Sequence, residues 1–259
     1  MKSTVLLTRS LTTVLGAISA LKTHADFSDD FSSQSLANYT VYNPLAAFGT
    51  PASFVFPGAG LQINVPQSAL PTQLGPGRAG AFVNGQSYGN VAVSYDILNS
   101  GTGKQYAGAF VEIGTLGIGQ VSGYTVGYDY SANEFLIAKV VGEVTQGPIS
   151  QTAASGVLAL TPGDVLHVDY SDINGQQFAT LTDKTTGKVL SSVSGSDATF
   201  TQGSVGLGVA IQSTQAGLTA TTTFGNFSVT TLTVPEPSTW ALAVIGLGAL
   251  VWSARQRRA

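Results

Sequence analysis

Short segments that alternate apolar and polar residues follow one another along most of this chain. Successive side chains of a β-strand point to opposite faces, so this alternation predicts strands with one buried face. The clearest example is residues 164–193, where Leu166, Val168 and Tyr170 share one face and an Asn-Gly pair at 174–175 favours a tight hairpin turn. A second turn follows at 185–187. These residues predict an antiparallel meander of three strands.

The other predicted strands are rich in β-branched and aromatic residues and are separated by glycine or serine. They cover residues 54–56, 61–65, 81–83, 90–98, 107–113, 124–130, 135–141, 157–160, 205–211 and 222–230. About twelve to fourteen strands in one domain, with no helix of useful length, predict an all-β, two-sheet antiparallel sandwich. An immunoglobulin-like pair of sheets and a parallel β-helix are the alternatives, although no short repeat of fixed period supports a β-helix.

The C-terminal residues carry a different pattern. An extended motif at 234–239 contains Pro235, Glu236 and Pro237. Residues 238–254 then hold no ionisable side chain and would reach roughly 25 Å as a helix, enough to span a bilayer core of about 30 Å when its ends snorkel. The basic end, 255–259, contains Arg255, Arg257 and Arg258. We expect a single transmembrane helix with this end in the cytoplasm, because positive residues beside a span stay there.

The N-terminal residues 1–25 have the organisation of a secretory signal peptide. Lys2 and Arg9 precede an apolar stretch at 11–21 that is too short to span a membrane comfortably. A small-x-small pattern at 23–25 predicts cleavage before Asp26. Residues 26–231 are then the exported domain.

The C-terminal combination resembles the PEP-CTERM sorting tail of exported proteins of Gram-negative bacteria. The proline-glutamate-proline motif, the span and the arginine-rich end lie in the expected order within residues 232–259. In that family the tail is recognised by exosortase, a membrane-embedded cysteine protease, and its carriers are associated with exopolysaccharide and biofilm. The resemblance implies exosortase, the secretion machinery and the inner membrane as partners. It also implies an anchored precursor that later reaches the cell surface or extracellular matrix.

The central domain resembles concanavalin A-like lectin and glucanase domains. The pattern G-D-x-L-x-V-x-Y…N-G…A-x-L-x-D-x-x-T-G-x-x-L at 163–190 carries this resemblance, together with Asp29-Asp30-Phe31 at the start and residues 224–229 at the end. The resemblance covers residues 26–231 and implies a jelly roll whose terminal strands pair side by side.

Composition narrows the functions of the exported domain. Residues 26–234 contain five basic and thirteen acidic residues, a net charge of −8. Such a surface repels phosphate, so nucleic acid is not an expected partner, whereas neutral polysaccharide and divalent cations are compatible. The chain has no cysteine, which excludes disulfides and thiolate chemistry.

No catalytic residue is predicted. The E-x-D-x-x-E signature of jelly-roll glycanases is absent, and Glu112, Glu134 and Glu143 each stand alone in the sequence. His167 and Asp169 share a strand face, but residues at i and i+2 are about 7 Å apart, which argues against a catalytic triad. We interpret His167 as an exposed sheet histidine.

Ligand sites rest on two sets of residues. Tyr124, Tyr128 and Tyr130 alternate on one predicted strand and could line a concave face that binds sugar, or pack in the core. Asp29 and Asp30 are candidates for the structural calcium that jelly-roll lectins often hold, or begin a solvated strand. We expect a non-enzymatic carbohydrate-binding or structural matrix protein; the alternative is a glycan hydrolase or lyase whose carboxylates come from separate strands.

Overall fold

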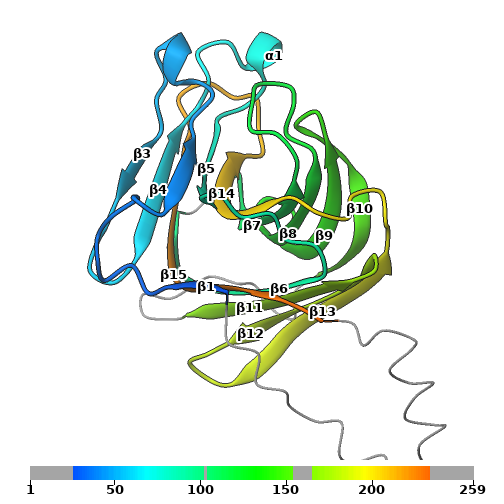
Figure 1. Ribbon diagram of the computed structural model, residues 1–259. Helices are drawn as coiled ribbons and strands as arrows, with labels where there is room; N and C mark the ends of the chain where they lie inside the picture. Colours follow the sequence, from blue (N-terminus) through cyan, green and yellow to red (C-terminus); the bar gives the residue numbers. More distant parts are fainter. Residues whose placement is uncertain (1–25, 102–103, 154–164, 234–259) are drawn as a thin grey trace, which may run out of the picture.

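A computed structural model describes residues 26–101, 104–153 and 165–233. Two antiparallel sheets pack face to face (Figure 1), which confirms the predicted all-β sandwich. The signal peptide, the strand expected at 157–160, the sorting motif and the transmembrane helix lie outside the described residues. Within the described ranges, no helix is both long and apolar enough to cross a bilayer.

The larger sheet contains eight strands and includes both ends of the described domain. Its order is β13 (Lys188–Ser196), β12 (Gln176–Asp183), β11 (Leu166–Ile173), β6 (Val91–Ser100), β15 (Thr219–Thr231), β4 (Leu61–Pro66) and β3 (Ser53–Val55), with β1 (Phe27–Asp29) also paired to β15. Phe27 lies opposite Val229, so the terminal strands pair side by side as expected.

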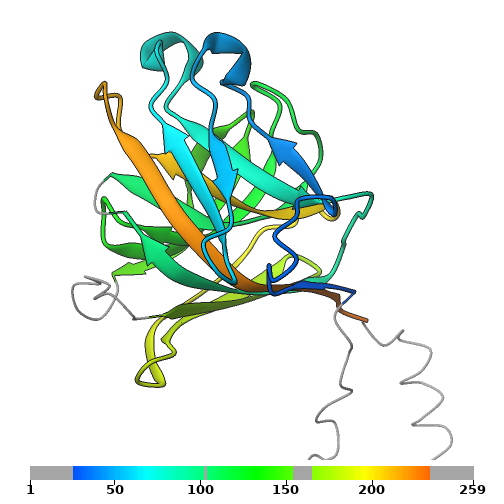
Figure 2. The ribbon, with the colours of Figure 1, turned by 90° about the vertical axis from the view of Figure 1, so that its left-hand side faces the viewer.

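The smaller sheet has seven strands and is strongly curved (Figure 1). Its order is β10 (Val144–Ala153), β9 (Glu134–Val141), β8 (Gly123–Asp129), β7 (Gln105–Ile113), β14 (Ser204–Ile211), β5 (Arg78–Val83) and β2 (Tyr39–Tyr42). The two helical segments of the described chain are short, η1 (Ala46–Phe48) and α1 (Pro71–Leu74), and lie at the same end of the sandwich (Figure 2).

The core lies between the sheets and is built from alternate residues of each strand. On β11, Leu166, Val168 and Tyr170 are all buried, as their spacing predicted. The meander is also confirmed, because β11, β12 and β13 are consecutive neighbours. Asn174 and Gly175 have φ angles of 54° and 78°, the positive values that a tight two-residue hairpin turn requires.

Candidate functional site

The outer, concave face of the smaller sheet carries the candidate site. Along β7, the small side chains of Ala107 and Ala109 enter the core, which turns Tyr106, Gly108 and Phe110 to the concave face. The same alternation holds on β5, where Ala79 and Ala81 are buried between the sheets. The tetrapeptide Ala-Gly-Ala-Phe occurs on both strands, at 79–82 and 107–110, on either side of β14.

Four glycines lie in one row across this face. Gly208 of β14 pairs with Gly80 of β5 and Gly108 of β7, and Gly108 pairs in turn with Gly127 of β8. A Cβ added to Gly108 would lie 2.3 Å from the Val126 carbonyl oxygen, so no larger residue fits without moving backbone. The glycine row is therefore a strip of bare backbone in the middle of the concave face.

Three aromatic rings cover this strip. The Tyr106 hydroxyl lies 2.6 Å and 2.7 Å from the positions that a Cβ would take on Gly108 and Gly127. Phe110 covers Gly208 in the same way, and Phe82 lies next to Gly80. The ring centroids of Phe82 and Phe110 are 6.2 Å apart, and those of Tyr106 and Phe110 are 6.3 Å apart. Glycine thus lets three rings lie close to the sheet as one aromatic floor.

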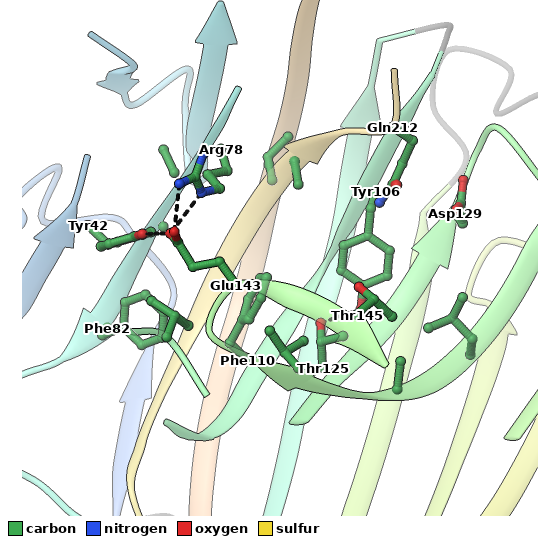
Figure 3. Close-up of a pocket in the computed structure, with 18 residues that line it drawn as sticks. Tyr42, Arg78, Phe82, Tyr106, Phe110, Thr125, Asp129, Glu143, Thr145 and Gln212 are labelled. Atoms are coloured by element: carbon green, nitrogen blue, oxygen red, sulfur yellow. Dashed lines mark hydrogen bonds and ion pairs between the residues drawn. The ribbon is translucent and has the colours of Figure 1, made fainter. Parts of the chain in front are cut away.

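A cavity of about 210 Å³ opens above this floor (Figure 3). Its apolar lining includes Phe82, Phe110, Leu136 and Val140. Its polar lining consists of Tyr42, Arg78, Tyr106, Thr125, Asp129, Glu143, Thr145 and Gln212. The Thr125 hydroxyl donates a 2.7 Å hydrogen bond to the Tyr106 oxygen, which fixes the Tyr106 ring over the glycines. An apolar floor with convergent polar groups is the usual composition of a small-ligand site.

An ion pair spans one side of the cavity. Arg78 Nε and Nη2 donate to Glu143 Oε1 and Oε2 at 2.8 Å and 2.7 Å, a bidentate pair that we call the Arg78–Glu143 bridge. The Tyr42 hydroxyl and the backbone amide of Gly119 also donate to Glu143. The second terminal nitrogen of Arg78 donates to the carbonyl oxygens of Leu74 and Pro76. Glu143, which the sequence placed alone, is in fact held from three segments distant in the chain.

The bridge joins the two sides of the smaller sheet. Glu143 lies in the turn between β9 and β10, whereas Arg78 begins β5 and Tyr42 ends β2 at the opposite edge. Adjacent strands are about 4.8 Å apart, so the four spacings from β9 to β5 would measure roughly 19 Å in a flat sheet. Direct contact of the side chains therefore requires the strong curvature of the sheet, and the bridge in turn holds that curvature.

Burial acts against both charges of the bridge. It raises the pKa of the Glu143 carboxyl and lowers the pKa of the Arg78 guanidinium, because each ion loses water of hydration. The side chains are 10% and 15% exposed, respectively. Bidentate contact and the additional donors offset this loss.

Asp129, the other carboxylate of the cavity lining, serves the turn after β8. Its Oδ1 accepts hydrogen bonds from the Ser131 amide and hydroxyl and from the Ala132 amide. Glu134 lies opposite Asp129 across the β8–β9 pair but does not line the cavity.

The candidate tyrosines, Tyr124 and Tyr128 of β8 and Tyr130 directly after it, do not line the cavity. Tyr124 and Tyr128 are 0% and 1% exposed, and Tyr130 packs against the core. Tyr124 donates to Asp197, and Tyr128 to Asn133. The concave face of β8 consists instead of Thr125, Gly127 and Asp129. Core packing, the second interpretation of the sequence, accounts for the tyrosines, and their role in sugar binding stays untested.

Asp29 and Asp30 lie at the end of β1. Asp29 accepts hydrogen bonds from the Phe31 amide and the Tyr39 hydroxyl, and Asp30 accepts one from the Ser32 amide. These contacts shape a turn at the surface. Across the described ranges, no group of three or more histidine, cysteine or acidic side chains is arranged to hold a metal ion. Calcium binding by this pair remains a prediction.

His167 belongs to a polar cluster on the outer face of the larger sheet. Asp96, whose side chain is 1% exposed, accepts hydrogen bonds from His167 at 2.6 Å, Lys184 at 2.8 Å and Asn226 at 2.6 Å. We call these four residues the Asp96 cluster. Asp169 Oδ1 lies 3.3 Å from His167 Nε2, so these side chains make contact, and the absence of a catalytic triad here stays a prediction. The 7 Å spacing applies to the backbone, whereas the side-chain tips lean together.

The surroundings of His167 include a serine. Ser94 Oγ lies 3.5 Å from Nε2, while Asp96 holds Nδ1, an order that resembles a Ser-His-Asp triad. However, Asp169 and Asp96 raise the pKa of His167 to about 9, and Asp169 competes with Ser94 for Nε2. A histidine that is already protonated at neutral pH does not accept the serine proton.

Two further carboxylates, Glu112 and Asp172, are each 2% exposed. Asp172 accepts hydrogen bonds from the Gly175 amide and the Tyr170 hydroxyl, whereas Glu112 Oε2 has no hydrogen-bond partner among the described residues. Burial, with the charge of Asp172 nearby, raises the pKa of Glu112 to about 8. Glu112 is therefore not alone in the fold, because the strand end that carries Asp172 lies near it.

The cavity residues were missed by the sequence analysis. Arg78 and Glu143 are 65 positions apart, and nothing local to either residue indicates the contact. The repeated Ala-Gly-Ala-Phe segment was the signal that could have indicated this face. Its alanines share one side of the strand, and its glycine and phenylalanine share the other, a pattern that lets aromatic rings pack closely on glycine backbone.

Comparisons with known protein sequences identify the C-terminal motif. Residues 233–258 match the PEP-CTERM protein-sorting motif, so the chain carries this motif at its C-terminus. A comparison with curated protein sequences finds no match.

Solved structures of similar fold include concanavalin A-like lectins and glucanases. The exoplasmic/lumenal domain of VIP36 in its Ca²⁺/Man-bound form superposes with a TM-score of 0.56 at 8% identity, over 83% of this chain and 94% of that one. A prokaryotic beta-1,3-1,4-glucanase (lichenase) derived from a mouse hindgut metagenome gives 0.55 at 8% identity, over 80% and 99%. Laminarinase from Flavobacterium sp. UMI-01 gives 0.54 at 9% identity, over 80% and 100%. At these identities the likeness establishes the concanavalin A-like jelly-roll fold.

Proposed function

We propose that this protein is an exosortase-sorted surface or matrix protein whose sandwich domain binds neutral polysaccharide without cleaving it. The cavity on the concave face of the smaller sheet carries the proposal. Its floor is aromatic, and its hydroxyl, amide and carboxylate groups converge from several strands. Sugar rings have apolar faces and hydroxyl edges, so they match a floor of this kind with polar walls.

The sorting tail supports the proposed location. The PEP-CTERM motif supports an exported protein that is anchored in the membrane until exosortase processes it. The acidic charge of the exported region favours a neutral glycan over an anionic one. The names of the similar structures add glycan classes to test, since they include a mannose-bound lectin domain, a laminarinase and a lichenase.

The contacts of the carboxylates support binding without hydrolysis. Glycoside hydrolysis requires one carboxylic acid and one carboxylate that face each other across the scissile bond. Glu143 is engaged by Arg78, and one oxygen of Asp129 holds a turn. Both carboxylates are therefore already engaged within the protein, which supports binding without hydrolysis.

Titration of the full chain with neutral oligosaccharides tests this function. The protein is held in a detergent without a sugar headgroup, and β-1,3-glucan, β-1,3-1,4-glucan, mannan and galactan oligosaccharides are tested by calorimetry. We expect one series to bind and Phe110→Ala to weaken its binding at least tenfold. Phe178→Ala is the matched control, because Phe178 is an exposed ring on the larger sheet. No binding in any series, equal loss in the control, or release of reducing sugar would contradict the proposal.

A further inference from the structure

The cavity is closed on one side by more than the Arg78–Glu143 bridge. The loop between β7 and β8, residues 114–122, folds over the same part of the concave face. Its Val121 is 4% exposed and packs with Phe82 and Ile113 in a second, smaller hydrophobic cluster. Tyr42, Phe110 and Leu116 complete this cluster. Apolar side chains therefore cover the concave face at this point.

The loop and the turn that carries Glu143 are held together. The Glu143 amide donates to the Val121 carbonyl at 2.8 Å, and the Gly142 amide donates to the Ser122 hydroxyl at 2.9 Å. Because Glu143 is also bonded to Arg78 and Tyr42, the loop, the turn and β5 form one wall. This wall is built from backbone hydrogen bonds, an ion pair and packed side chains, so it is not a pair of loose surface charges.

The other side of the cavity is lined differently. Figure 3 shows Tyr42, Arg78, Phe82 and Glu143 on one side of the cavity and Tyr106, Asp129, Thr145 and Gln212 on the other. No residue of the second group belongs to the bridge or to the hydrophobic cluster. A ligand that enters past these polar groups meets the wall after crossing the aromatic floor.

We infer that the cavity is blind and recognises the end of a glycan chain rather than an internal segment. This inference rests on the proposed function. An internal glycan segment must leave a site on both sides. The bridge and the hydrophobic cluster around Val121 would instead stop a glycan at Arg78 and Glu143. The volume agrees, because 210 Å³ is below the roughly 300–1,000 Å³ of sites for larger ligands. The terminal sugar would lie on Phe110 with its hydroxyls next to the bridge.

Chain length is the test. Oligosaccharides of two, four and six units, and the long polymer of the same linkage, are titrated into the full chain for each of the four neutral series. In a series that binds, we expect affinity to level off by four units, and the polymer to bind one protein per matching chain end. Affinity that rises through six units, with many proteins bound along each polymer, would overturn the blind site but leave polysaccharide binding intact. Absence of binding in all four series would instead contradict the proposed function itself.

A variant of the bridge tests the wall directly. Arg78→Ala combined with Glu143→Ala removes the ion pair together with most of both side chains, which opens the wall at this point, and we expect six-unit chains to gain affinity over two-unit chains by at least fivefold. The single change Glu143→Ala is the milder form if the double variant loses its fold, as judged by its melting temperature. Lys139→Ala is the matched control, because Lys139 pairs with Asp197 at 2.6 Å outside the cavity. An unchanged length dependence in a folded bridge variant would overturn the inference.

Discussion

The Asp96 cluster and the Arg78–Glu143 bridge solve the problem of a buried charge in different ways. Asp96 is joined to residues of its own neighbourhood in the sheet, since His167 is its direct partner on β11 and Gly225 its partner on β15. The bridge connects the turn after β9 with β5, four places away in the sheet, across the concave face. The first arrangement fixes the register of adjacent strands, whereas the second fixes the shape of a whole sheet.

We expect this difference to separate the charges that affect stability alone from those that would also affect the proposed ligand binding. Asp96 is covered on the outer face of the larger sheet, and its donors saturate it. Glu143 is also saturated, but it borders a cavity. Changes in the Asp96 cluster should therefore alter unfolding without altering ligand binding, and changes in the bridge should do both.

The largest effect is expected from Asp96→Asn. The change leaves the donors of His167, Lys184 and Asn226 facing an amide, and loss of one partner in a buried ionic cluster costs about 3 to 5 kcal/mol of unfolding free energy. Urea denaturation at pH 7 measures this loss. Oligosaccharide affinity of the folded fraction should stay constant, and a loss below about 1 kcal/mol would show that Asp96 does not organise the outer face.

Unlike Asp96 and Glu143, Glu112 is a buried carboxyl without a cationic partner among the described residues. Its pKa is raised from its ordinary value to about 8, so the folded state holds a proton that the unfolded state releases between about pH 4.5 and 8. Stability from this proton is complete below pH 4.5 and is lost as pH rises to 8. We expect Glu112→Gln to remove this decline and to stabilise the domain at pH 8.5 by on the order of 2 to 4 kcal/mol. Identical stability curves from pH 4.5 to 8.5 would contradict the prediction.

Arg78→Met should have a smaller effect on unfolding than Asp96→Asn. The pair is partly exposed, and the Tyr42 hydroxyl and Gly119 amide remain to hold Glu143, so we expect a loss of about 1 to 2 kcal/mol. Lys139→Met should cost less than about 1 kcal/mol, because Asp197 keeps its bonds to Tyr124 and Thr199. Parallel denaturation of the two variants measures the difference, and a larger loss in Lys139→Met would break the distinction between the bridge and an ordinary ion pair.

The smallest effect on stability is expected from Asp169→Asn. Asp169 contributes most to the raised pKa of His167, but it is 60% exposed, so its loss should cost less than about 1 kcal/mol. The pKa of His167 should fall from about 9 towards its ordinary value, which NMR titration of the imidazole measures. A raised histidine pKa stabilises the fold below about pH 6.5, and this stabilisation is lost as pH rises through 9. The unfolding free energy of the variant should therefore fall less between pH 6.5 and 9 than that of the unaltered protein. An unchanged titration would assign the shift to Asp96 alone.

Strands and hairpins were predictable because they depend on local sequence. The alternation at Leu166, Val168 and Tyr170 and the Asn-Gly turn after them each specify a structure within a few residues. The pairing of β1 with β15 followed from resemblance to a known jelly roll and not from any local rule. The sorting motif was likewise readable, since its three parts lie in order within the last residues.

The concave face that carries the candidate site was not predictable from single strands. On β8, both alternating sets could have formed the concave face, and the large rings of Tyr124 and Tyr128 go inward, where they bury the most area. On β7 the order is reversed, because Ala107 and Ala109 fill the core and Phe110 turns outward. Which set is buried depends on the space left by the opposite sheet, and the contact of Arg78 with Glu143 depends on curvature that no segment encodes alone.

The pairing of β1 with β15 has a consequence for how the domain is presented. Asp26 accepts a hydrogen bond from the Thr231 amide, so the two described ends of the domain leave from one place (Figure 1). That place belongs to the larger sheet, whereas the cavity opens on the far side of the smaller one. An attachment through either end therefore anchors the back of the domain and leaves its concave face directed away from the support, open to polymers in the surroundings.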